Sequence, residues 1–347
     1  MRFAIWNAAQ ETDKSSWLRA WSHWREREVF AHPSYVQLYR HDGDEAICAA
    51  WVDGDVMILY PFLLRRVGPY NHADQVDIIT PYGYGGPFCS GKLTDEVAGR
   101  FWASFDAWAH ARGVVSEFVR FSLFQETLVA WPGNRIPRSV NIVRSLDVSD
   151  ETMWQEAEYK VRKNVKRARF SGIRIEADPE GAGFSNFMDI YYQTMNRRSA
   201  LSSYYFPEAY FRSLHENLMG SFMYFHAFLG DKVIASELVL VSNENCYSFL
   251  GGTDEHYFDH RPNDLLKYEI FQLSREMGKR RFVLGGGYEP GDGIFRYKRS
   301  FAPNGQVEFH VGTRILNEPA YNRLIQDRKE REPEWQPRPD FFPIYRA

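Results

Sequence analysis

The sequence predicts an α/β protein made of two tandem, similar domains, each with a mixed, mostly antiparallel sheet flanked by helices. Two observations predict this. Both halves of the chain contain apolar strand segments joined by a Gly-Asp turn and followed by a helical segment. Glycine landmarks also recur in the same order: Gly54-Asp55 with Gly230-Asp231, Gly85-Gly86 with Gly251-Gly252, and Gly113 with Gly278. We interpret this order as an internal duplication.

The elements of the first half follow from local patterns. Trp17, Trp21 and Trp24 have the spacing of one helical face, which predicts a helix over 17–27. A short helix over 34–39 is expected after Pro33, because proline favours the first helical position. The remaining elements are a hairpin of strands 45–51 and 56–64, a tyrosine-rich loop at 80–87, a helix over 94–111 and a strand over 116–121.

The second half repeats this order with strands at 223–229 and 233–241, a third strand ending at 252, a helix over 263–277 and a strand over 281–284. The distance from hairpin turn to double glycine is longer in the first half, which indicates an insertion around 65–75. We therefore predict a first domain over 1–148 and a second over 149–316. A further helix is expected over 319–329.

Composition excludes several classes of protein. The 347 residues contain 42 Lys+Arg and 45 Asp+Glu, with a net charge of -3 and a mean hydropathy of -0.47. The longest apolar run, 56–64, is far shorter than the roughly 20 residues that span a bilayer. No signal peptide is evident, so we expect a cytoplasmic protein. Cys48, Cys89 and Cys246 are widely spaced, which fits reduced packing residues.

Six cationic side chains lie within 160–169. On a helix, Lys160, Lys163 and Arg167 share one face, while Val161, Val165 and Ala168 mark an apolar face. Together with Lys166, the three cationic residues are candidates for binding the phosphates of tRNA or of a nucleotide-linked substrate. A solvated helix face is the alternative.

Four segments carry a family resemblance: the basic segment 160–169 with Gly172-Ile173, the segment 190–197, the segment 230–235, and Gly285-Gly286-Gly287 followed by 293–301. The last has the pattern G-I-x-x-x-K-x-x-F and is the most specific. The chain resembles the Fem-like aminoacyltransferases, the peptidoglycan-bridge group of the GNAT acyltransferase superfamily. The resemblance implies tandem GNAT-like domains and a C-terminal segment, 317–347, that returns to the first domain. It also implies transfer of an aminoacyl group from aminoacyl-tRNA, or of an acyl group from a thioester, onto an amine.

The resemblance also implies site residues. Lys298 matches the lysine of the terminal motif, which lies near the reacting centre, and its ammonium would stabilise a developing oxyanion. The alternative is a strand lysine that extends to solvent. Arg197 and the pair Tyr204-Tyr205 match the family's substrate-binding arginine and tyrosine pair more loosely, because Leu201-Ser202-Ser203 precede the tyrosines here.

Other candidates come from the residues themselves. Tyr82 and Tyr84 of the loop 80–87, and Tyr288 after the glycine cluster, are expected to bind the acceptor, with packing against the sheet as the alternative. Glu237 and Asp292 are candidate proton acceptors for the attacking amine. Glu237 has an alternative outward orientation by strand alternation.

The segment that precedes the helix over 263–277 indicates the kind of acyl donor. The helix over 263–277 follows His260-Arg261-Pro262-Asn263-Asp264 rather than the glycine-rich loop that holds the pyrophosphate of acyl-CoA. This favours an aminoacyl-tRNA donor, and no metal or redox cofactor is expected. We predict transfer of an aminoacyl or acyl group to the amine of a small peptide, amino sugar or cell-wall-type precursor. The alternatives are an acyl-CoA-dependent N-acyltransferase with a divergent donor loop and a non-catalytic sugar- or peptide-binding protein.

Overall fold

The computed structural model describes residues 2–67 and 75–347. These form two compact units: unit 1 contains Met1–Arg138 and Phe309–Ala347, and unit 2 contains Ser139–Glu308. The insertion expected around 65–75 lies largely outside the described residues. The predicted domain ranges, 1–148 and 149–316, stay a prediction.

Unit 1 is built on a sheet that is antiparallel except for one parallel pair, β4 with β6. Its strands, in spatial order, are β1 (Phe3–Asn7), β2 (Glu45–Asp53), β3 (Val56–Arg66), β4 (Val76–Ile79), β6 (Val114–Arg120) and β13 (Gln306–Ile315), and β5 (Phe88–Ser90) pairs with β3. The predicted β2–β3 hairpin is confirmed. Gly54 has a φ of +61° in its turn, a backbone conformation that favours glycine.

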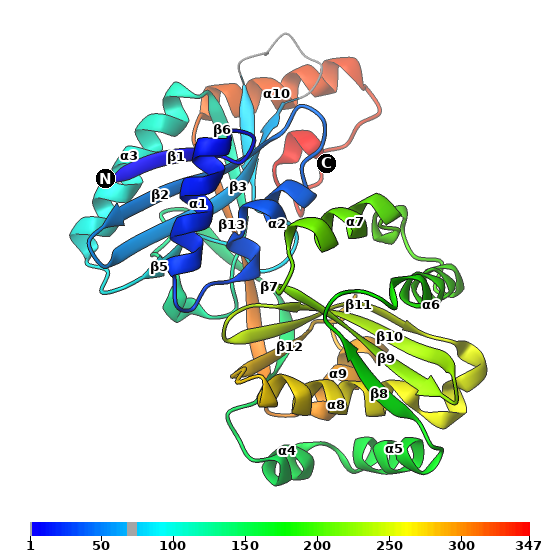
Figure 1. The fold of residues 1–347 in the computed structure, drawn as a ribbon. Coiled ribbons are helices and arrows are strands. Elements are labelled where there is room, and N and C mark those ends of the chain that lie inside the picture. Colours follow the sequence, from blue (N-terminus) through cyan, green and yellow to red (C-terminus); the bar gives the residue numbers. More distant parts are fainter. Residues whose placement is uncertain (1, 68–74) are drawn as a thin grey trace. The chain divides into compact units, whose positions relative to one another are not determined.

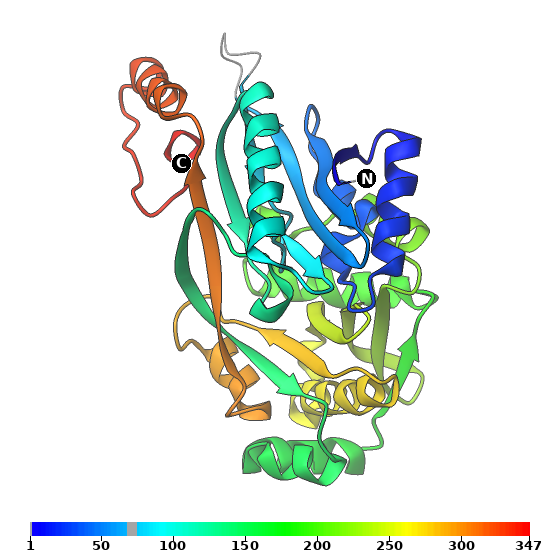
Figure 2. The same cartoon turned by 90° about the vertical axis from the view of Figure 1, so that its left-hand side faces the viewer.

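Both faces of the unit 1 sheet are covered by helices. Along β2, Ile47, Ala49 and Trp51 pack in one apolar cluster with α3 (Asp95–Ala111), which crosses the front of the sheet in Figure 2. The alternate residues, Ala46, Cys48 and Ala50, pack in a second cluster with α1 (Glu11–His23) and α2 (Pro33–Leu38). Because both faces are buried, β2 and β3 are apolar at nearly every position. The C-terminal helix α10 (Glu318–Arg331) and the short turn Ile344–Arg346 complete this unit.

The predicted first helix is shifted. The structure places it at Glu11–His23, not 17–27, and Trp24 lies just past its end in an extended conformation. Trp17 and Trp24 are nevertheless both buried. The polar residues of the first turns suit this helix because Glu11 and Asp13 lie at its N-terminus, where negative charge is favourable. Trp17 and Trp21 therefore lie on the helix, whereas Trp24 lies in the extended segment that follows it.

Unit 2 has a sheet with the spatial order β7 (Asn134–Ser145), β12 (Arg281–Gly285), β11 (Asn245–Thr253), β10 (Lys232–Val241), β9 (Phe222–Leu229) and β8 (Arg174–Asp178). Only β11 and β12 pair in parallel. Figure 1 shows α6 (Phe184–Arg197) and α7 (Glu208–Asn217) on one side of this sheet and α8 (Pro262–Glu276) on the other.

Two further helices, α4 (Asp150–Glu156) and α5 (Tyr159–Phe170), lie outside α8 (Figure 1). The apolar face predicted for the basic segment is confirmed, because Val161, Val165 and Ala168 are all buried. The remaining elements of the chain are α9 (Gly293–Phe301) and the 3-10 turns Val29–Ala31, Gln125–Thr127, Ser202–Tyr204 and Glu255–His260.

The two units share one order of elements. In unit 1 the hairpin β2–β3 is followed by β4, the short strand β5, α3 and β6, and in unit 2 the hairpin β9–β10 is followed by β11, α8 and β12. The last strand pairs in parallel with β4 in unit 1 and with β11 in unit 2. Two long strands are divided between the units: residues 139–145 of β7 belong to unit 2, and residues 309–315 of β13 belong to unit 1. The predicted α/β fold class is confirmed.

A buried polar network links β3, β6 and β13 with α3 in unit 1. Tyr60 donates a hydrogen bond to Glu117 at 3.1 Å, and Arg314 of β13 lies 3.5 Å from Glu117 and 2.7 Å from Asp106. Burial raises the pKa of Glu117 to about 8, although the charge of Arg314 opposes this shift. Glu117 therefore favours its protonated form in the folded chain.

The Glu117 carboxyl should make stability depend on pH. Its pKa is about 8 when folded against 4.5 in the unfolded chain, so its stabilising contribution is complete below 4.5 and is lost as pH rises through about 8. In Glu117→Gln the free energy of unfolding should fall less than in the wild type over this range. Denaturant unfolding at a series of pH values measures the difference. The exposed Glu96, paired with Arg100, provides the control Glu96→Gln. A pH-independent difference for Glu117→Gln would contradict the argument.

Candidate functional site

The parallel strands β11 and β12 pair over only a short stretch before they separate. Their pairing covers Asn245–Tyr247 against Arg281–Val283, after which β12 ends at Gly285 while β11 continues to Thr253. Opposite this point the register of β10 and β11 shifts, since Leu238 faces Leu250 but Val239 faces Ser248. Such a bulge redirects side chains locally. Polar side chains from β10, β11, α8 and α9 gather where the two strands separate.

The centre of this group is a buried ion pair. Lys267 of α8 donates hydrogen bonds to the Glu237 carboxylate of β10 and, at 3.0 Å, to the Ser248 hydroxyl. The side chains of Lys267 and Glu237 are only 8% and 9% exposed. Two charges buried this deeply persist because each neutralises the other. Glu237 therefore points inward to α8 rather than to solvent, and its proposed role as proton acceptor stays a prediction.

Lys298 lies on α9, so the alternative of a strand lysine reaching solvent is wrong. The glycine cluster is followed by the Asp292 cap, which starts a helix in place of a strand. The Lys298 ammonium donates a hydrogen bond to the Gly286 carbonyl at 2.7 Å. Burial, together with the positive charge of Lys267, lowers the pKa of Lys298 to about 8. The ammonium is thus held in a poorly solvated place, where its charge acts strongly.

Asp292 shapes the segment between β12 and α9. Its carboxylate accepts hydrogen bonds from the backbone N–H groups of Phe295 at 2.7 Å, Tyr288 at 2.7 Å and Glu289 at 3.1 Å. These bonds lower the pKa of Asp292. A Cβ at Gly287 would lie 2.5 Å from this carboxylate, which explains one glycine of the cluster. The Tyr288 ring is 66% exposed. The catalytic role of Asp292 stays a prediction.

The N-terminal end of α8 is in contact with α5. Asn164 of α5 donates a hydrogen bond to Asp264 at 3.1 Å, and Asp264 is only 8% exposed. Burial raises the pKa of Asp264. A helix N-terminus binds a pyrophosphate through exposed N–H groups and positive potential. Here Asn164 of α5 and the Asp264 carboxyl group lie at the start of the helix.

Sequence reasoning missed several of these residues. Lys267 is one, and its signal is a lysine inside the apolar run Leu265-Leu266-Lys267-Tyr268. Tyr297 is another: its buried hydroxyl has no hydrogen-bond partner in the described part of the chain. The carboxyl groups that influence its pKa, which is raised mainly by burial, are Asp264 and Glu237. A buried polar atom without a partner is uncommon and marks a place where a ligand or water can bind.

The other candidates of unit 2 lie around the ends of α6 and β11. Arg197 donates a hydrogen bond to the Thr253 carbonyl at 3.1 Å and lies 4.9 Å from the Phe258 ring centre. Tyr205 donates to Asn196 at 3.0 Å, and the Tyr204 carbonyl accepts from Tyr191. Arg197 and the tyrosine pair therefore have partners within unit 2.

Tyr82 and Tyr84 belong to unit 1. The Tyr82 side chain is 52% exposed, and its carbonyl accepts a hydrogen bond from Tyr35 at 2.8 Å. Tyr84 packs edge-on against Phe30 and Phe309, with ring centres 5.6 and 5.7 Å apart. Of the two, Tyr82 presents its ring to solvent.

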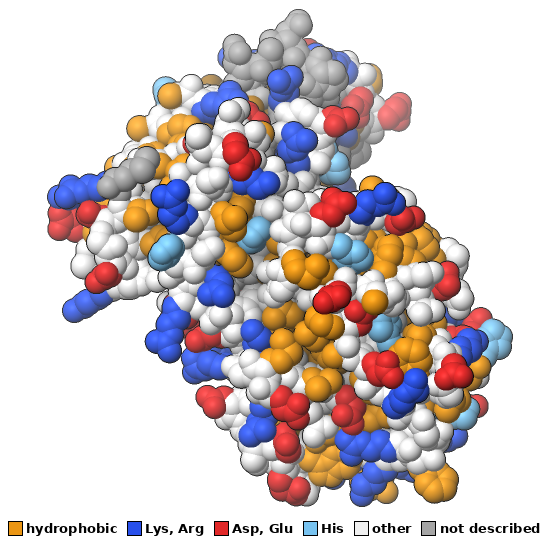
Figure 3. All heavy atoms as spheres, in the orientation of Figure 1, with side chains coloured by type: hydrophobic (Ala, Val, Ile, Leu, Met, Phe, Trp, Pro, Cys, Tyr) orange, Lys and Arg blue, Asp and Glu red, His pale blue; other side chains and the backbone are white. Residues whose placement is uncertain are grey.

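The candidate phosphate-binding residues share the outer surface of α5. Lys160, Lys163, Lys166 and Arg167 are all exposed, and Lys166 lies 5.9 Å from the Trp154 ring centre. Figure 3 shows Lys and Arg side chains interspersed with Asp and Glu over the end of unit 2 where α4 and α5 lie. The cationic face is therefore local, as the sequence indicated.

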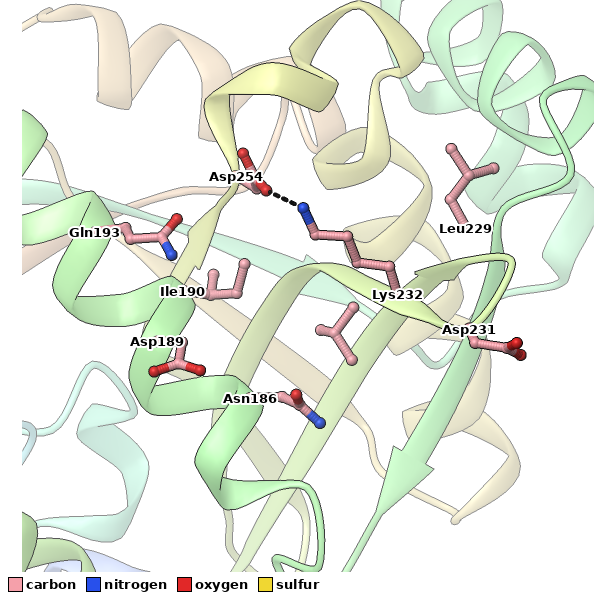
Figure 4. A pocket seen from close by; sticks show the side chains of 9 residues that line it. Asn186, Asp189, Ile190, Gln193, Leu229, Asp231, Lys232 and Asp254 are labelled. Carbon is pink, nitrogen blue, oxygen red and sulfur yellow. Dashed lines mark hydrogen bonds and ion pairs between the residues drawn. The ribbon is translucent and has the colours of Figure 1, made fainter.

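A surface pocket of about 640 Å³ lies on the α6 side of unit 2. Figure 4 shows the ion pair between Lys232 and Asp254, 2.9 Å long, beside the polar side chains of α6. The lining residues are Asn186, Asp189, Ile190, Gln193, Leu229, Asp231, Lys232, Val233 and Asp254. None of them was predicted as a site residue, and none belongs to the group around Lys298.

Within residues 2–67 and 75–347, no three His, Cys, Asp or Glu side chains are grouped so that they could hold a metal ion. His256 and His260 lie in a 3-10 turn, and His256 bonds to Asp254 at 2.8 Å. No described helix combines the length and the apolar character needed to cross a membrane.

Comparisons with known proteins show which known domain is similar to the part of unit 2 that contains Lys267, Glu237 and Lys298. The family model for the acetyltransferase (GNAT) domain matches residues 155–299. Unit 2 contains a GNAT domain. The match extends from α4 to α9, so Lys267, Glu237 and Lys298 all lie within the GNAT domain. A sequence search of curated proteins found no match.

Solved structures extend the likeness to most of the chain. A structure of FemX aligns with a TM-score of 0.68 at 15% identity and covers 89% of this chain and 98% of its own. A C-terminal domain of a lysylphosphatidylglycerol synthetase from Agrobacterium fabrum, described as putative, has a TM-score of 0.53 at 12% identity, covering 90% and 96%. A protein of unknown function from Bacteroides thetaiotaomicron VPI-5482 has 0.55 at 11%, covering 90% and 99%. The Fem-like GNAT resemblance is confirmed at the level of fold.

The partly buried Lys298 of the GNAT domain should cost stability in its charged form. Its pKa is about 8 when folded against 10.5 in the unfolded chain, so the cost is complete below about pH 8 and disappears as pH rises to 10.5. The wild type should therefore gain stability relative to Lys298→Met over this interval. Denaturant unfolding at each pH measures the gain. The exposed Lys329 of α10 provides the control Lys329→Met, which should show no such change.

Proposed function

We propose that the protein transfers an aminoacyl group, or an acyl group, from a carrier to the amine of an acceptor, with Lys298 as the residue that stabilises the developing charge. The observation that carries this proposal is the partly buried Lys298 ammonium on α9, whose pKa is influenced by the Lys267–Glu237 ion pair in the GNAT domain. A fixed cation in a poorly solvated place lowers the energy of an oxyanion without reorganisation during the reaction.

The reaction follows from the groups involved. The neutral amine nitrogen of the acceptor attacks the carbonyl carbon of the donor ester, and the carbonyl oxygen becomes an oxyanion beside Lys298. The new C–N bond is kept while the C–O bond to the carrier breaks. The proton lost by the amine passes to the leaving oxygen, directly or through water. Catalysis here depends on positioning and electrostatic stabilisation.

We propose aminoacyl-tRNA as the donor. Support comes from the start of α8, where Asn164 and the buried Asp264 occupy the position that a pyrophosphate would need. The exposed cations of α5 offer a surface for a polynucleotide instead. For the acceptor, the Fem-like fold supports a small peptide, amino sugar or cell-wall-type precursor, with Tyr82, Tyr288, Arg197, Tyr204 and Tyr205 as candidate contacts.

Replacing Lys298 should lower kcat much more than it changes substrate binding. Removal of one oxyanion-stabilising group costs about 100-fold in rate or more, so Lys298→Met should lose at least that much. In the wild type, activity should decline as pH rises through about 8, where Lys298 loses its charge. Lys298→Arg keeps the charge and should move this decline to higher pH. Initial rates across pH measure both effects, with Lys329→Met as the control. Unchanged turnover in Lys298→Met would refute the assignment.

The cationic face of α5 should bind the donor through phosphates. In Lys163→Gln and Arg167→Gln, affinity for aminoacyl-tRNA should fall, and the slope of log affinity against log salt should decrease by about 0.7 to 0.9 for each contact removed. Filter binding at several salt concentrations measures this slope. Lys329→Gln is the matched control on an exposed helix of unit 1. Equal slopes in all four proteins would place the donor elsewhere.

Two labelled donors test the whole proposal. Aminoacyl-tRNA and acetyl-CoA are each incubated with the protein and a pool of amine acceptors, and transfer of label is followed. Label from aminoacyl-tRNA alone would support the proposal. Label from acetyl-CoA would indicate an acyl-CoA enzyme with a divergent donor loop, and no transfer from either donor would favour a binding protein.

A further inference from the structure

The outer face of α5 carries a line of side chains with an aromatic ring at each end and two lysines between them. The members, Tyr159, Lys163, Lys166 and Phe170, have the spacing i, i+4, i+7 and i+11, so they lie within about 60° of one another on the helix. We call these four residues the α5 stripe. The buried residues of α5, such as Val165, lie on the opposite side. The stripe is about 16 Å long, given the rise of an α-helix.

Both aromatic rings of the α5 stripe are open to solvent. Phe170 is 94% exposed, more than any other large hydrophobic residue in the described part of the chain, and Tyr159 is 73% exposed. Neither side chain makes a hydrogen bond or a ring contact with another described residue. The rings therefore contribute little to the core of unit 2. Exposed rings beside cations are typical of surfaces that bind a nucleic acid strand.

The C-terminal end of α5 forms without help from Phe170. The Gly172 N–H donates to the Arg169 carbonyl at 3.0 Å, and the next N–H along the chain donates to the Ala168 carbonyl at 3.3 Å. These two bonds are those of a Schellman motif, and the φ of +77° at Gly172 allows the turn. Ile173 follows and packs into the core of unit 2. Since Ile173 supplies the apolar residue at this end, Phe170 stays on the surface.

The cations of α5 divide into two groups. Arg162 donates to backbone carbonyls, and Arg169 pairs with Glu269 at 2.6 Å, so these two guanidinium groups have partners within unit 2. Lys163 of the stripe and the neighbouring Arg167 have neither a side-chain hydrogen bond nor an ion pair with another described residue. The charges on the outer face are therefore available to a polyanion.

The order of groups along the α5 stripe fits an unpaired nucleotide strand. Such a strand offers the faces of its bases to aromatic rings and its phosphates to cations. A duplex stacks its bases internally and offers mainly phosphates, so it would leave both rings unused. A lipid surface suits apolar side chains gathered over a broad helix face. The two rings of the stripe are instead separated by cations along a single line.

We propose that the α5 stripe binds an unpaired RNA segment, with Tyr159 and Phe170 stacking on bases and Lys163 and Lys166 contacting phosphates. The identity of this RNA as the acyl donor rests on the proposed function. The stacking surface itself rests on the residues of α5. The inference adds that α5 recognises unpaired nucleotides of the donor rather than its paired arms.

Fluorescence anisotropy with labelled RNA tests the stripe. The probes are a short single-stranded oligoadenylate and a paired RNA duplex with the same number of phosphates. The wild type should bind the single strand about fivefold more tightly or better. In Phe170→Ala and in Tyr159→Ala, single-strand affinity should fall about fivefold or more, because each variant loses one stacked base. The dependence of affinity on salt should stay unchanged, since no cation is removed.

Three further variants complete the test. Phe170→Trp keeps an aromatic ring and should bind the single strand as the wild type does. Lys163→Gln should reduce the slope of log affinity against log salt by about 0.7 and keep both stacked bases. Met219→Ala is the matched control, since Met219 is a 62% exposed apolar residue of unit 2 outside α5.

Two results would overturn the inference. One is equal affinity of the wild type for the two RNAs, or unchanged single-strand affinity in both Phe170→Ala and Tyr159→Ala. The other is binding to phosphatidylglycerol vesicles that depends on Phe170, without binding of either RNA, which would identify a lipid surface instead.

This test is separate from that of the proposed function, because oligoadenylate carries no acyl group. If the stripe binds the single strand as described but neither labelled donor supports transfer, the proposed function fails and the stripe stands. If aminoacyl-tRNA supports transfer but both ring variants bind RNA as the wild type does, the stripe fails and the proposed function stands.

Discussion

The short parallel pairing of β11 and β12 is the constraint on which the candidate site of unit 2 depends. Because only three residue pairs join these strands, β11 runs on beyond the end of β12 and the chain between β12 and α9 must turn sharply. The Asp292 carboxylate holds this turn through backbone N–H groups, and the turn brings Lys298 back to the Gly286 carbonyl. Lys267 then meets Glu237 in the space that β12 does not fill.

Much of the fold was predictable because its signals are local. The Gly-Asp turns mark both hairpins, and Thr94 caps α3 through its hydroxyl, so these elements are found from a few residues each. The first helix was misplaced because burial of Trp24 does not require helical backbone. The site was harder to predict. Lys298 stands in a recognisable motif, whereas Lys267 lies in a helix where lysines are usually exposed, and its burial depends on Glu237, which is 30 residues away in the sequence.

Lys298 in unit 2 and Arg120 in unit 1 are partly buried cations with similar hydrogen-bond partners. Lys298 and Arg120 each donate to a backbone carbonyl, that of Gly286 and that of Thr80 respectively. A carbonyl oxygen stabilises a cation without neutralising it, so the positive charge stays available to a third group. The Lys267–Glu237 pair differs, because a carboxylate cancels its charge and leaves mainly a fixed scaffold. In unit 2, Lys298 thus keeps its charge available, whereas the Lys267–Glu237 pair supports the structure.

The division of β7 and β13 between the two units also bears on how the chain folds during synthesis. All of unit 2 is contained in 139–308, but unit 1 needs 309–347 in addition to its first 138 residues. Until those last residues leave the ribosome, β6 has no β13 beside it, and Glu117 has no Arg314 to approach it. An unpaired strand edge invites association with other chains. Synthesis from the N-terminus therefore completes the second unit first and leaves the first unit waiting, the reverse of the usual order for tandem domains.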